Sequence, residues 1–295
     1  MGIFTNALEK LIKKKFKNTG EMHTDVVSER LIKQELADFN FFPDVESYKT
    51  LDSTNNFLKR YAERGIVTDT VVIAESQTAG RGRIGRSFYS PDGMGIYFSI
   101  ILHPKKQIIK CTDITTMAAA AEVLAIESAL KISPCIKWVN DIYFGNKKVS
   151  GILAESKLNA DTDVPEYVIL GVGINIYTPE KGFPEDIKDV AGALLPDNNE
   201  IPNLKNSLVA GFLINFLKFY NNLPDKSYMD MYREKCFCIG KDVTVINSDH
   251  TEITGVALDR THAHVLGVND DGNLRVRYGD GYEEDLSSGE ISIKL

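Results

Sequence analysis

Gln77-Thr-Ala-Gly80-Arg81-Gly82-Arg83-Ile84-Gly85-Arg86 is the stretch that decides whether this chain has a dinucleotide-binding fold. It contains Gly80-x-Gly82-x-x-Gly85, the glycine spacing of that fold. In such folds the third glycine opens a helix whose N-terminus binds the pyrophosphate. Here Pro91, Gly93 and Gly95 follow, and they prevent a long helix. The stretch therefore predicts a loop, and a Rossmann fold is excluded.

The charge of this loop differs from that of the whole protein. Between Glu75 and Asp92 there are three arginines and no acidic residue, whereas the chain has a formal charge of −7. Arginine presents a planar set of donors that suits phosphate or carboxylate, and glycine lets the backbone close around a ligand. A solvated basic loop is the alternative. The alternation of glycine with arginine favours an anion-binding loop.

A second polar cluster begins with Lys137-Trp138-Val139-Asn140-Asp141 and continues to Glu155. It predicts a strand, a polar break and a hairpin that turns at Gly145-Asn146. On the returning strand we expect Lys148 and Ser150 on one face, with Lys147, Val149 and Gly151 on the other. Trp138 is the only tryptophan and is typical of a core anchor, and Asn140-Asp141 is also compatible with a simple turn.

A third element, Val168–Asn175, is an apolar strand with Gly171 and Gly173 on the same face. Glycine weakens a strand, so its presence indicates close approach of a ligand or of another backbone. Ordinary sheet packing is the alternative.

The 295 residues suggest about two domains, and 43% hydrophobic residues are enough for a core. The negative charge argues against nucleic acid as a main partner. Four cysteines are too few for a disulfide scaffold, and no apolar run reaches the ~20 residues of a membrane span. We therefore expect a cytoplasmic protein. Met1–Asn18 predicts an amphipathic helix, and His262-Ala263-His264 is a weak metal pair without a third ligand nearby.

Three regions are expected: a helical N-terminal segment 1–44, a mixed α/β region 45–236, and a β-rich region 237–295. The expected helices are Asp25–Leu36, Ser53–Arg64, Thr112–Lys131 and Leu204–Leu223. The expected strands of the middle region are Thr70–Glu75, Gly95–Leu102, Cys135–Trp138, Ile142–Phe144, Lys147–Glu155 and Glu166–Ile174. The expected strands of the last region are Val243–Ile246, Thr254–Leu258, Leu274–Tyr278 and Glu290–Lys294, which suggest a small SH3-like barrel.

Taken together and in this order, the motifs resemble those of the biotin protein ligase family, from about Tyr48 to the C-terminus. They are Asp52-Ser53-Thr54-Asn55, the Gly80–Arg86 loop, Lys137-Trp138-x-Asn140-Asp141, Lys148-x-x-Gly151-Ile152-Leu153-x-Glu155, Gly171-x-Gly173-Ile174-Asn175 and Ser288-Gly289-Glu290-Ile291-Ser292. The resemblance implies an α+β fold, with a mixed-sheet catalytic domain and a C-terminal SH3-like β-barrel.

The resemblance also implies a reaction in two steps. Biotin and MgATP would give biotinyl-5′-AMP, and a lysine of a biotin carboxyl carrier domain would then attack it. Biotin would be bound at its head by Ser53, Thr54, Asn55 and Gln77, and the pocket and nucleotide site would be lined by Gly151, Gly171, Gly173 and Asn175. The Gly80–Arg86 loop, with Gly80, Arg81, Gly82 and Arg83, would cover biotin and the phosphate. Lys148 would contact carboxylate or phosphate, and Asp141 is the candidate to orient or deprotonate the acceptor lysine.

Two departures from the family are visible: Val139 stands where proline is common, and Phe88 where tryptophan is common. The segment before Tyr48 is too short for the DNA-reading module of repressor members, which implies the monofunctional type. A homodimer is expected, without nucleic acid or a membrane span. A lipoate ligase or related acyl transferase of the same fold is one alternative, and a non-catalytic biotin-responsive regulator is another.

Overall fold

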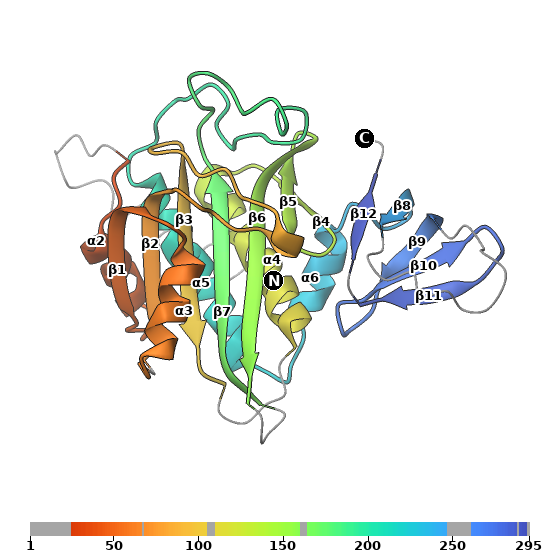
Figure 1. Cartoon of the computed structure of the whole chain (residues 1–295), viewed down its shortest axis with the longest axis horizontal. Helices are drawn as coiled ribbons and strands as arrows, with labels where there is room; N and C mark the ends of the chain where they lie inside the picture. Colours follow the sequence, from red (N-terminus) through yellow and green to blue (C-terminus); the bar gives the residue numbers. More distant parts are fainter. Residues whose placement is uncertain are drawn as a thin grey trace.

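The computed structural model describes residues 25–66, 68–104, 110–159, 164–246, 261–287 and 289–293, which form two β-sheets and five α-helices (Figure 1). The larger sheet has the strand order β1-β2-β3-β7-β6-β5-β4, with β1 and β2 parallel and the other neighbours antiparallel. Its strands are β1 Asp44–Leu51, β2 Thr70–Gln77, β3 Gly95–Leu102, β4 Cys135–Lys137, β5 Asp141–Phe144, β6 Lys147–Leu158 and β7 Pro165–Asn175.

Helices cover both faces of this sheet. α4 and α5 pack against each other behind the sheet in Figure 1, and α3 packs on β2, β3 and β7 at the front. α4 is rich in alanine and is buried on nearly all sides, as expected for an apolar helix between a sheet and another helix. The helices are α2 Glu29–Ala37, α3 Thr54–Glu63, α4 Cys111–Leu130, α5 Leu204–Asn221 and α6 Tyr228–Lys235.

The second sheet is antiparallel, with the order β11-β10-β9-β8-β12, and lies to one side of the first (Figure 1). Its strands are β8 Asp242–Ile246, β9 His262–Val268, β10 Leu274–Tyr278, β11 Glu283–Leu286 and β12 Glu290–Ser292. The mixed α+β class is confirmed, and this sheet is consistent with the SH3-like barrel. The predicted helix Met1–Asn18 and strand Thr254–Leu258 lie outside the described residues.

Four elements were not predicted from the sequence: β1, α6, β9 and β11. In β1 only Val45 is buried, so the strand lacks the alternation that identifies a half-buried strand. β1 lies at the edge of the sheet and pairs only with β2. α6 has eight residues, too few for a clear helical period.

Residues from both sheet regions meet at Trp138, which lines the pocket described below. Trp138 Nε1 donates to Gly272 O at 2.8 Å. A second contact is made by Lys226, whose Nζ lies 2.8 Å from Asp113 Oδ1 on α4 and 2.9 Å from Asp270 O, between β9 and β10. At the other end, α2 packs on α5 and β1. The described part of the N-terminal region therefore packs on the larger body, while the three-region boundaries remain a prediction.

Candidate functional site

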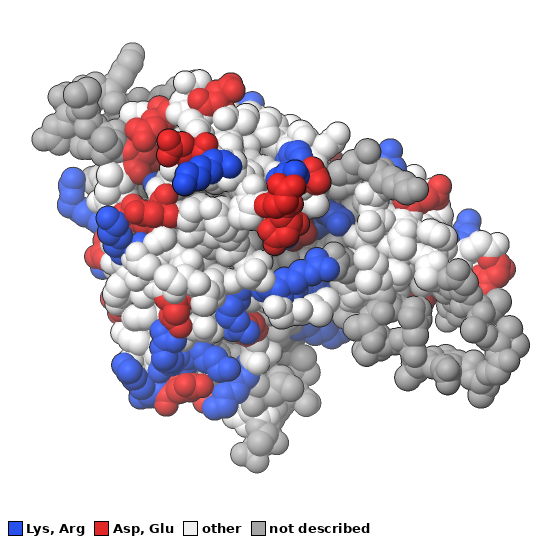
Figure 2. Space-filling view, turned by 45° about the horizontal axis from the view of Figure 1, so that its top comes forward, with Lys and Arg blue, Asp and Glu red and all other residues white. Residues whose placement is uncertain are grey.

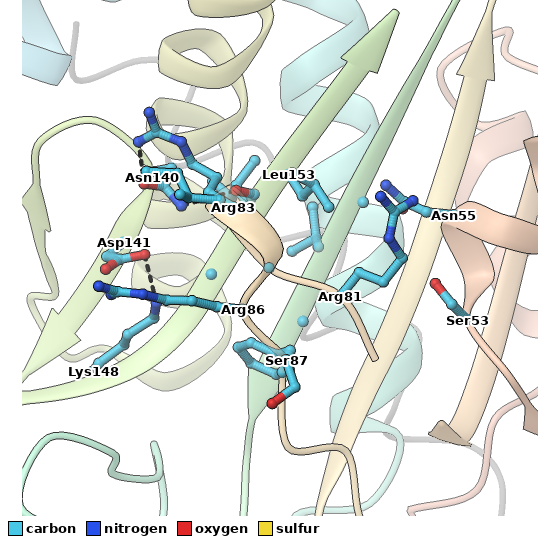
Figure 3. A pocket seen from close by; sticks show the side chains of 18 of the residues that line it. Ser53, Asn55, Arg81, Arg83, Arg86, Ser87, Asn140, Asp141, Lys148 and Leu153 are labelled. Atoms are coloured by element: carbon cyan, nitrogen blue, oxygen red, sulfur yellow. Dashed lines mark hydrogen bonds and ion pairs between the residues drawn. The ribbon is translucent and has the colours of Figure 1, made fainter. Parts of the chain in front are cut away.

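A pocket lies where the first turn of α3, the loop after β2 and the strands β5, β6 and β7 meet (Figure 3). Most of the predicted site residues line it: Ser53, Thr54, Asn55, Gln77, Arg81, Gly82, Arg83, Asp141, Lys148, Gly151, Gly171 and Gly173. Residues from separate motifs are thus brought to one place. Their predicted roles remain proposals.

Gly80 and Asn175 are the two predicted site residues that do not line the pocket. A Cβ on Gly80 would lie 2.4 Å from Phe88 O, so this glycine allows the two ends of the loop to approach. Asn175 Nδ2 donates to Gly192 O at 3.1 Å, and its side chain is buried. Both residues support the pocket from outside in this structure.

Neutral polar groups gather at one end of the pocket, at the start of α3. Gln77 Oε1 accepts from the Thr54 backbone N–H at 2.9 Å, and Gln77 Nε2 donates to Ser90 Oγ at 3.0 Å. Ser99 Oγ donates to Asn55 Oδ1 at 2.6 Å. These bonds fix the orientation of the Gln77 and Asn55 amides, because each amide oxygen faces a donor. This end can bind an uncharged polar group through hydrogen bonds.

The glycines of β6 and β7 form the floor of the pocket. A Cβ on Gly171 would lie 2.1 Å from Asn55 Oδ1, and a Cβ on Gly173 would lie 2.6 Å from the Phe88 ring. A Cβ on Gly151 would lie 3.2 Å from the same ring. Close approach of other groups therefore explains the glycines, and a side chain at Gly171 or Gly173 would displace Asn55 or Phe88.

Charged groups gather at the other end. Lys148 Nζ lies 2.6 Å from Asp141 Oδ1, and Arg83 donates to Asn140 Oδ1 at 3.0 Å and to Gly289 O at 3.4 Å. Figure 3 shows Lys148 and Asp141 facing each other, with Arg86 beside them. Several cations thus lie within one pocket, which suits a ligand with more than one negative charge.

The hairpin at Gly145-Asn146 is confirmed, but the predicted faces of β6 are wrong. The register between β5 and β6 shifts after Lys148, so that Tyr143 is opposite Lys148 and Ile142 is opposite Ser150. This β-bulge places Lys148 and Gly151 together on the pocket. Ser150 is instead fully buried. A strict two-residue alternation cannot anticipate a bulge.

Sequence reasoning did not assign the pocket residues Ile84, Arg86, Ser87, Phe88, Lys137, Trp138, Asn140, Ile152, Leu153, Val172 and Gly289. Phe88 packs over Gly173, and its place directly after the Gly-Arg loop was the available signal. Trp138 is buried as expected for a core anchor, yet it also lines the pocket. Gly289 comes from the distant C-terminal region, which no local pattern connects to the loop.

Glu122 is a buried acid on α4, behind the charged end of the pocket. Burial raises the pKa of Glu122 to about 8; the negative charge of Asp141 adds to this rise, and the neighbouring Ser150 hydroxyl opposes it. Neither Glu122 nor Ser150 has a side-chain hydrogen bond of normal geometry among the described residues. Burial therefore favours the uncharged form of the Glu122 carboxyl.

Metal ligands are sparse. Among the described residues no group of three or more His, Cys, Asp or Glu side chains could hold a metal ion. His264 is half exposed and lies 2.8 Å from Asp242 Oδ1. Asp141 is the carboxylate that lines the pocket, and Mg²⁺ is commonly held by one or two carboxylates together with substrate phosphates. The pocket thus fits a magnesium ion that arrives with a nucleotide.

Residues 47–175 match the Biotin/lipoate A/B protein ligase family. The chain is 30% identical over 276 residues to the bifunctional ligase/repressor BirA of Bacillus spizizenii, covering 92% of this chain and 76% of that protein. It belongs to this family. The expected resemblance to biotin protein ligases is confirmed, and the protein is a ligase.

Other relatives agree. The biotin--[acetyl-CoA-carboxylase] ligase of Mycobacterium tuberculosis is 28% identical, over 81% of this chain and 85% of the relative. The biotin protein ligase of Aquifex aeolicus, solved in complex with biotin and ATP, has a TM-score of 0.67 and 27% identity, over 86% of this chain and 99% of that chain.

Every helix in the described part of the chain is too short or too polar to cross a membrane.

Proposed function

We propose that the protein joins biotin to a lysine of a biotin carboxyl carrier domain by way of biotinyl-5′-AMP. Its family and relatives support this proposal, and so does its similarity to the Aquifex ligase that was solved with biotin and ATP. The observation that carries it is the division of one pocket into two ends. Amides and hydroxyls that can bind an uncharged polar group lie at one end, and Lys148 and Arg83 lie at the other.

These two ends suit the two parts of biotin. Its ureido ring is uncharged and has both donors and acceptors, which Ser53, Thr54, Asn55 and Gln77 can satisfy. Its carboxylate would extend over the glycine floor towards the cations. Figure 3 shows Ser53 and Asn55 on one side of the pocket, and Lys148 and Asp141 on the other.

In the first step an oxygen of the biotin carboxylate attacks the α-phosphorus of ATP, and the bond to pyrophosphate breaks. Negative charge increases on the phosphoryl oxygens, and Lys148 and Arg83 would stabilise it. Mg²⁺ bound to the triphosphate would neutralise the leaving pyrophosphate. The product is a mixed anhydride that water can hydrolyse, so a loop that excludes water has a purpose here.

In the second step the amine of the acceptor lysine attacks the acyl carbon, and AMP leaves. The amine must first lose a proton, because its usual pKa is near 10.4. Asp141 would accept or orient that proton. Its ion pair with Lys148 supports this role, because Lys148 would contact the phosphate that becomes the leaving AMP and the Asp141 carboxylate would then lie near the reacting bond.

The overall charge is compatible with a small anionic substrate, because the surface is mixed. Figure 2 shows Lys and Arg side chains interspersed with Asp and Glu on the face drawn. The binding of biotin and ATP therefore depends on local cations in the pocket rather than on the net charge of −7.

A homodimer is proposed as well, and sedimentation with biotin and ATP would test it.

Biotin-dependent exchange of pyrophosphate into ATP tests the proposal. We expect exchange with biotin and little with lipoate. A carrier domain should then gain the mass of one biotinyl group when biotin and MgATP are present. Exchange with lipoate instead of biotin would favour a lipoate ligase, and biotin binding without exchange would favour a non-catalytic regulator.

A further inference from the structure

Glu155, the last residue of the Lys148-x-x-Gly151 motif, has no role in the two reaction steps. It lies on β6 two residues after Leu153, which lines the pocket, so the two side chains share a face of the sheet. Glu155 Oε1 lies 2.9 Å from Arg81 Nη2, and Glu155 Oε2 accepts from Arg81 Nη1 at 2.9 Å. This is a bidentate pair, the strongest geometry for these groups.

The same carboxylate also holds Asn55. Asn55 Nδ2 donates to Glu155 Oε2 at 2.9 Å, while Asn55 Oδ1 accepts from Ser99 Oγ at 2.6 Å. Both ends of this amide therefore have partners, and the amide lies directly over Gly171. Without Glu155, the Asn55 amide would lose the partner that fixes its nitrogen.

Arg81 is tied to more than Glu155. Its Nη1 also donates to Asn56 Oδ1 at 3.1 Å, so the first turn of α3, β6 and the loop meet at this arginine. Arg83 also makes hydrogen bonds across the pocket, to Asn140 Oδ1 and Gly289 O. Asn55 and Arg81 point into the same region of Figure 3. Arg81 thus has its charge balanced by Glu155 before any anion binds.

From this arrangement we infer that Glu155 is a positioning residue, which holds Arg81 and Asn55 at the biotin end of the pocket and anchors the start of the loop to β6. The first arginine of the loop then serves as an anchor rather than as a ligand of the phosphate. This inference changes the expectation that Arg81 lies over the phosphate. It rests on the proposed function for its effect on biotin, but the anchoring itself needs no substrate.

The test compares Glu155→Gln with Glu166→Gln. Glu166 pairs with Lys157 of the neighbouring strand β6 at 2.8 Å, with both side chains about half exposed and outside the pocket. Glu155→Gln should raise KM for biotin about tenfold, with a smaller change in kcat of exchange, because ground-state contacts are lost. Glu166→Gln should change neither.

A second measurement uses no substrate, so it separates this inference from the proposed function. Limited trypsin digestion followed by mass spectrometry should show cleavage after Arg81 several times faster in Glu155→Gln than in the parent protein. The double variant Arg81→Glu/Glu155→Arg exchanges the two charges and keeps the ion pair. Trypsin should therefore cleave it slowly after the remaining loop arginines, Arg83 and Arg86. If Glu155→Gln alters neither KM nor cleavage, the inference is wrong. If Glu155→Gln fails to fold, fast cleavage of the loop in the folded double variant would show that Glu155 does not anchor the loop.

Discussion

Lys148 Nζ lies 2.6 Å from Asp141 Oδ1, so a cation on β6 and a carboxylate on β5 form an ion pair inside the pocket. Both side chains are about three-quarters buried. A pair at this depth is screened less by salt than a surface pair. An anionic ligand that binds Lys148 must compete with Asp141, and this competition connects the two steps of the proposed reaction.

Lys148→Ala should lower biotin-dependent pyrophosphate exchange by about a hundredfold or more, because it removes a cation from the charge that develops at phosphorus. Exchange is measured with radiolabelled pyrophosphate. Lys157→Ala is the matched control, since Lys157 lies on the same strand with an exposed carboxylate partner outside the pocket. Normal exchange in folded Lys148→Ala would contradict the role given to this lysine.

Asp141→Asn should affect the second step more than the first. The amide keeps the shape of the side chain but cannot take the proton of the acceptor amine. We expect transfer to a carrier domain to fall by about a hundredfold, within the usual range for acid–base catalysis, and exchange to fall much less. Single-turnover transfer from preformed biotinyl-5′-AMP measures the second step alone. An equal fall in both steps would mean that Asp141 mainly holds Lys148.

Much of the larger sheet could be predicted because its strands and helices bury apolar residues with a regular period. β3 is buried along its whole length, and α4 over most of its length. β1 was not predicted because its pairing with β2, rather than its own residue pattern, makes it a strand. Lys148 and Ser150 lie on different faces of β6 for another reason, since the extra residue of a β-bulge cannot be predicted from a two-residue period.

In the site, too, local features could be predicted from the sequence and contacts between distant residues could not. Gly171 and Gly173 signalled a close approach, and the structure places Asn55 and Phe88 there. The partners themselves could not be read from sequence, because Asn55 precedes Gly171 by more than a hundred residues. The pairing of Arg81 with Glu155 was hidden for the same reason.

The loop should become resistant to trypsin when both substrates are bound. Bound carboxylate and phosphate would neutralise the arginines that follow Gly82, and closure would protect the backbone. Ile84 is 66% exposed, which suits a segment that changes its contacts. Cleavage after Arg83 or Arg86 should slow severalfold with biotin and ATP together, and less with biotin alone. Equal cutting with and without both substrates would mean that this segment is no lid.

Glu122→Gln should stabilise the protein at alkaline pH. Burial raises the pKa of Glu122 from its ordinary 4.5 to about 8. Below pH 4.5 the carboxyl is protonated in both the folded and the unfolded chain, so it has no effect on the pH dependence. Between pH 4.5 and 8 the unfolded chain loses this proton while the folded protein keeps it, and stability falls as the pH rises. Above pH 8 the carboxyl is ionised in both states, and the full loss of stability from burying a charged carboxylate is present.

Glutamine cannot ionise, so the variant avoids this loss while keeping the shape of the side chain. The Tm of Glu122→Gln relative to the parent should therefore rise between pH 5 and pH 8.5, by roughly 5 °C or more. Thermal unfolding followed by circular dichroism at several pH values measures it. Glu127→Gln is the control on the same helix, because Glu127 pairs with Lys235 Nζ at 2.6 Å and its removal should give no gain at alkaline pH. A constant Tm difference for Glu122→Gln would mean that folding does not raise the pKa of Glu122, and a falling difference would mean that the folded protein stabilises the ionised carboxylate.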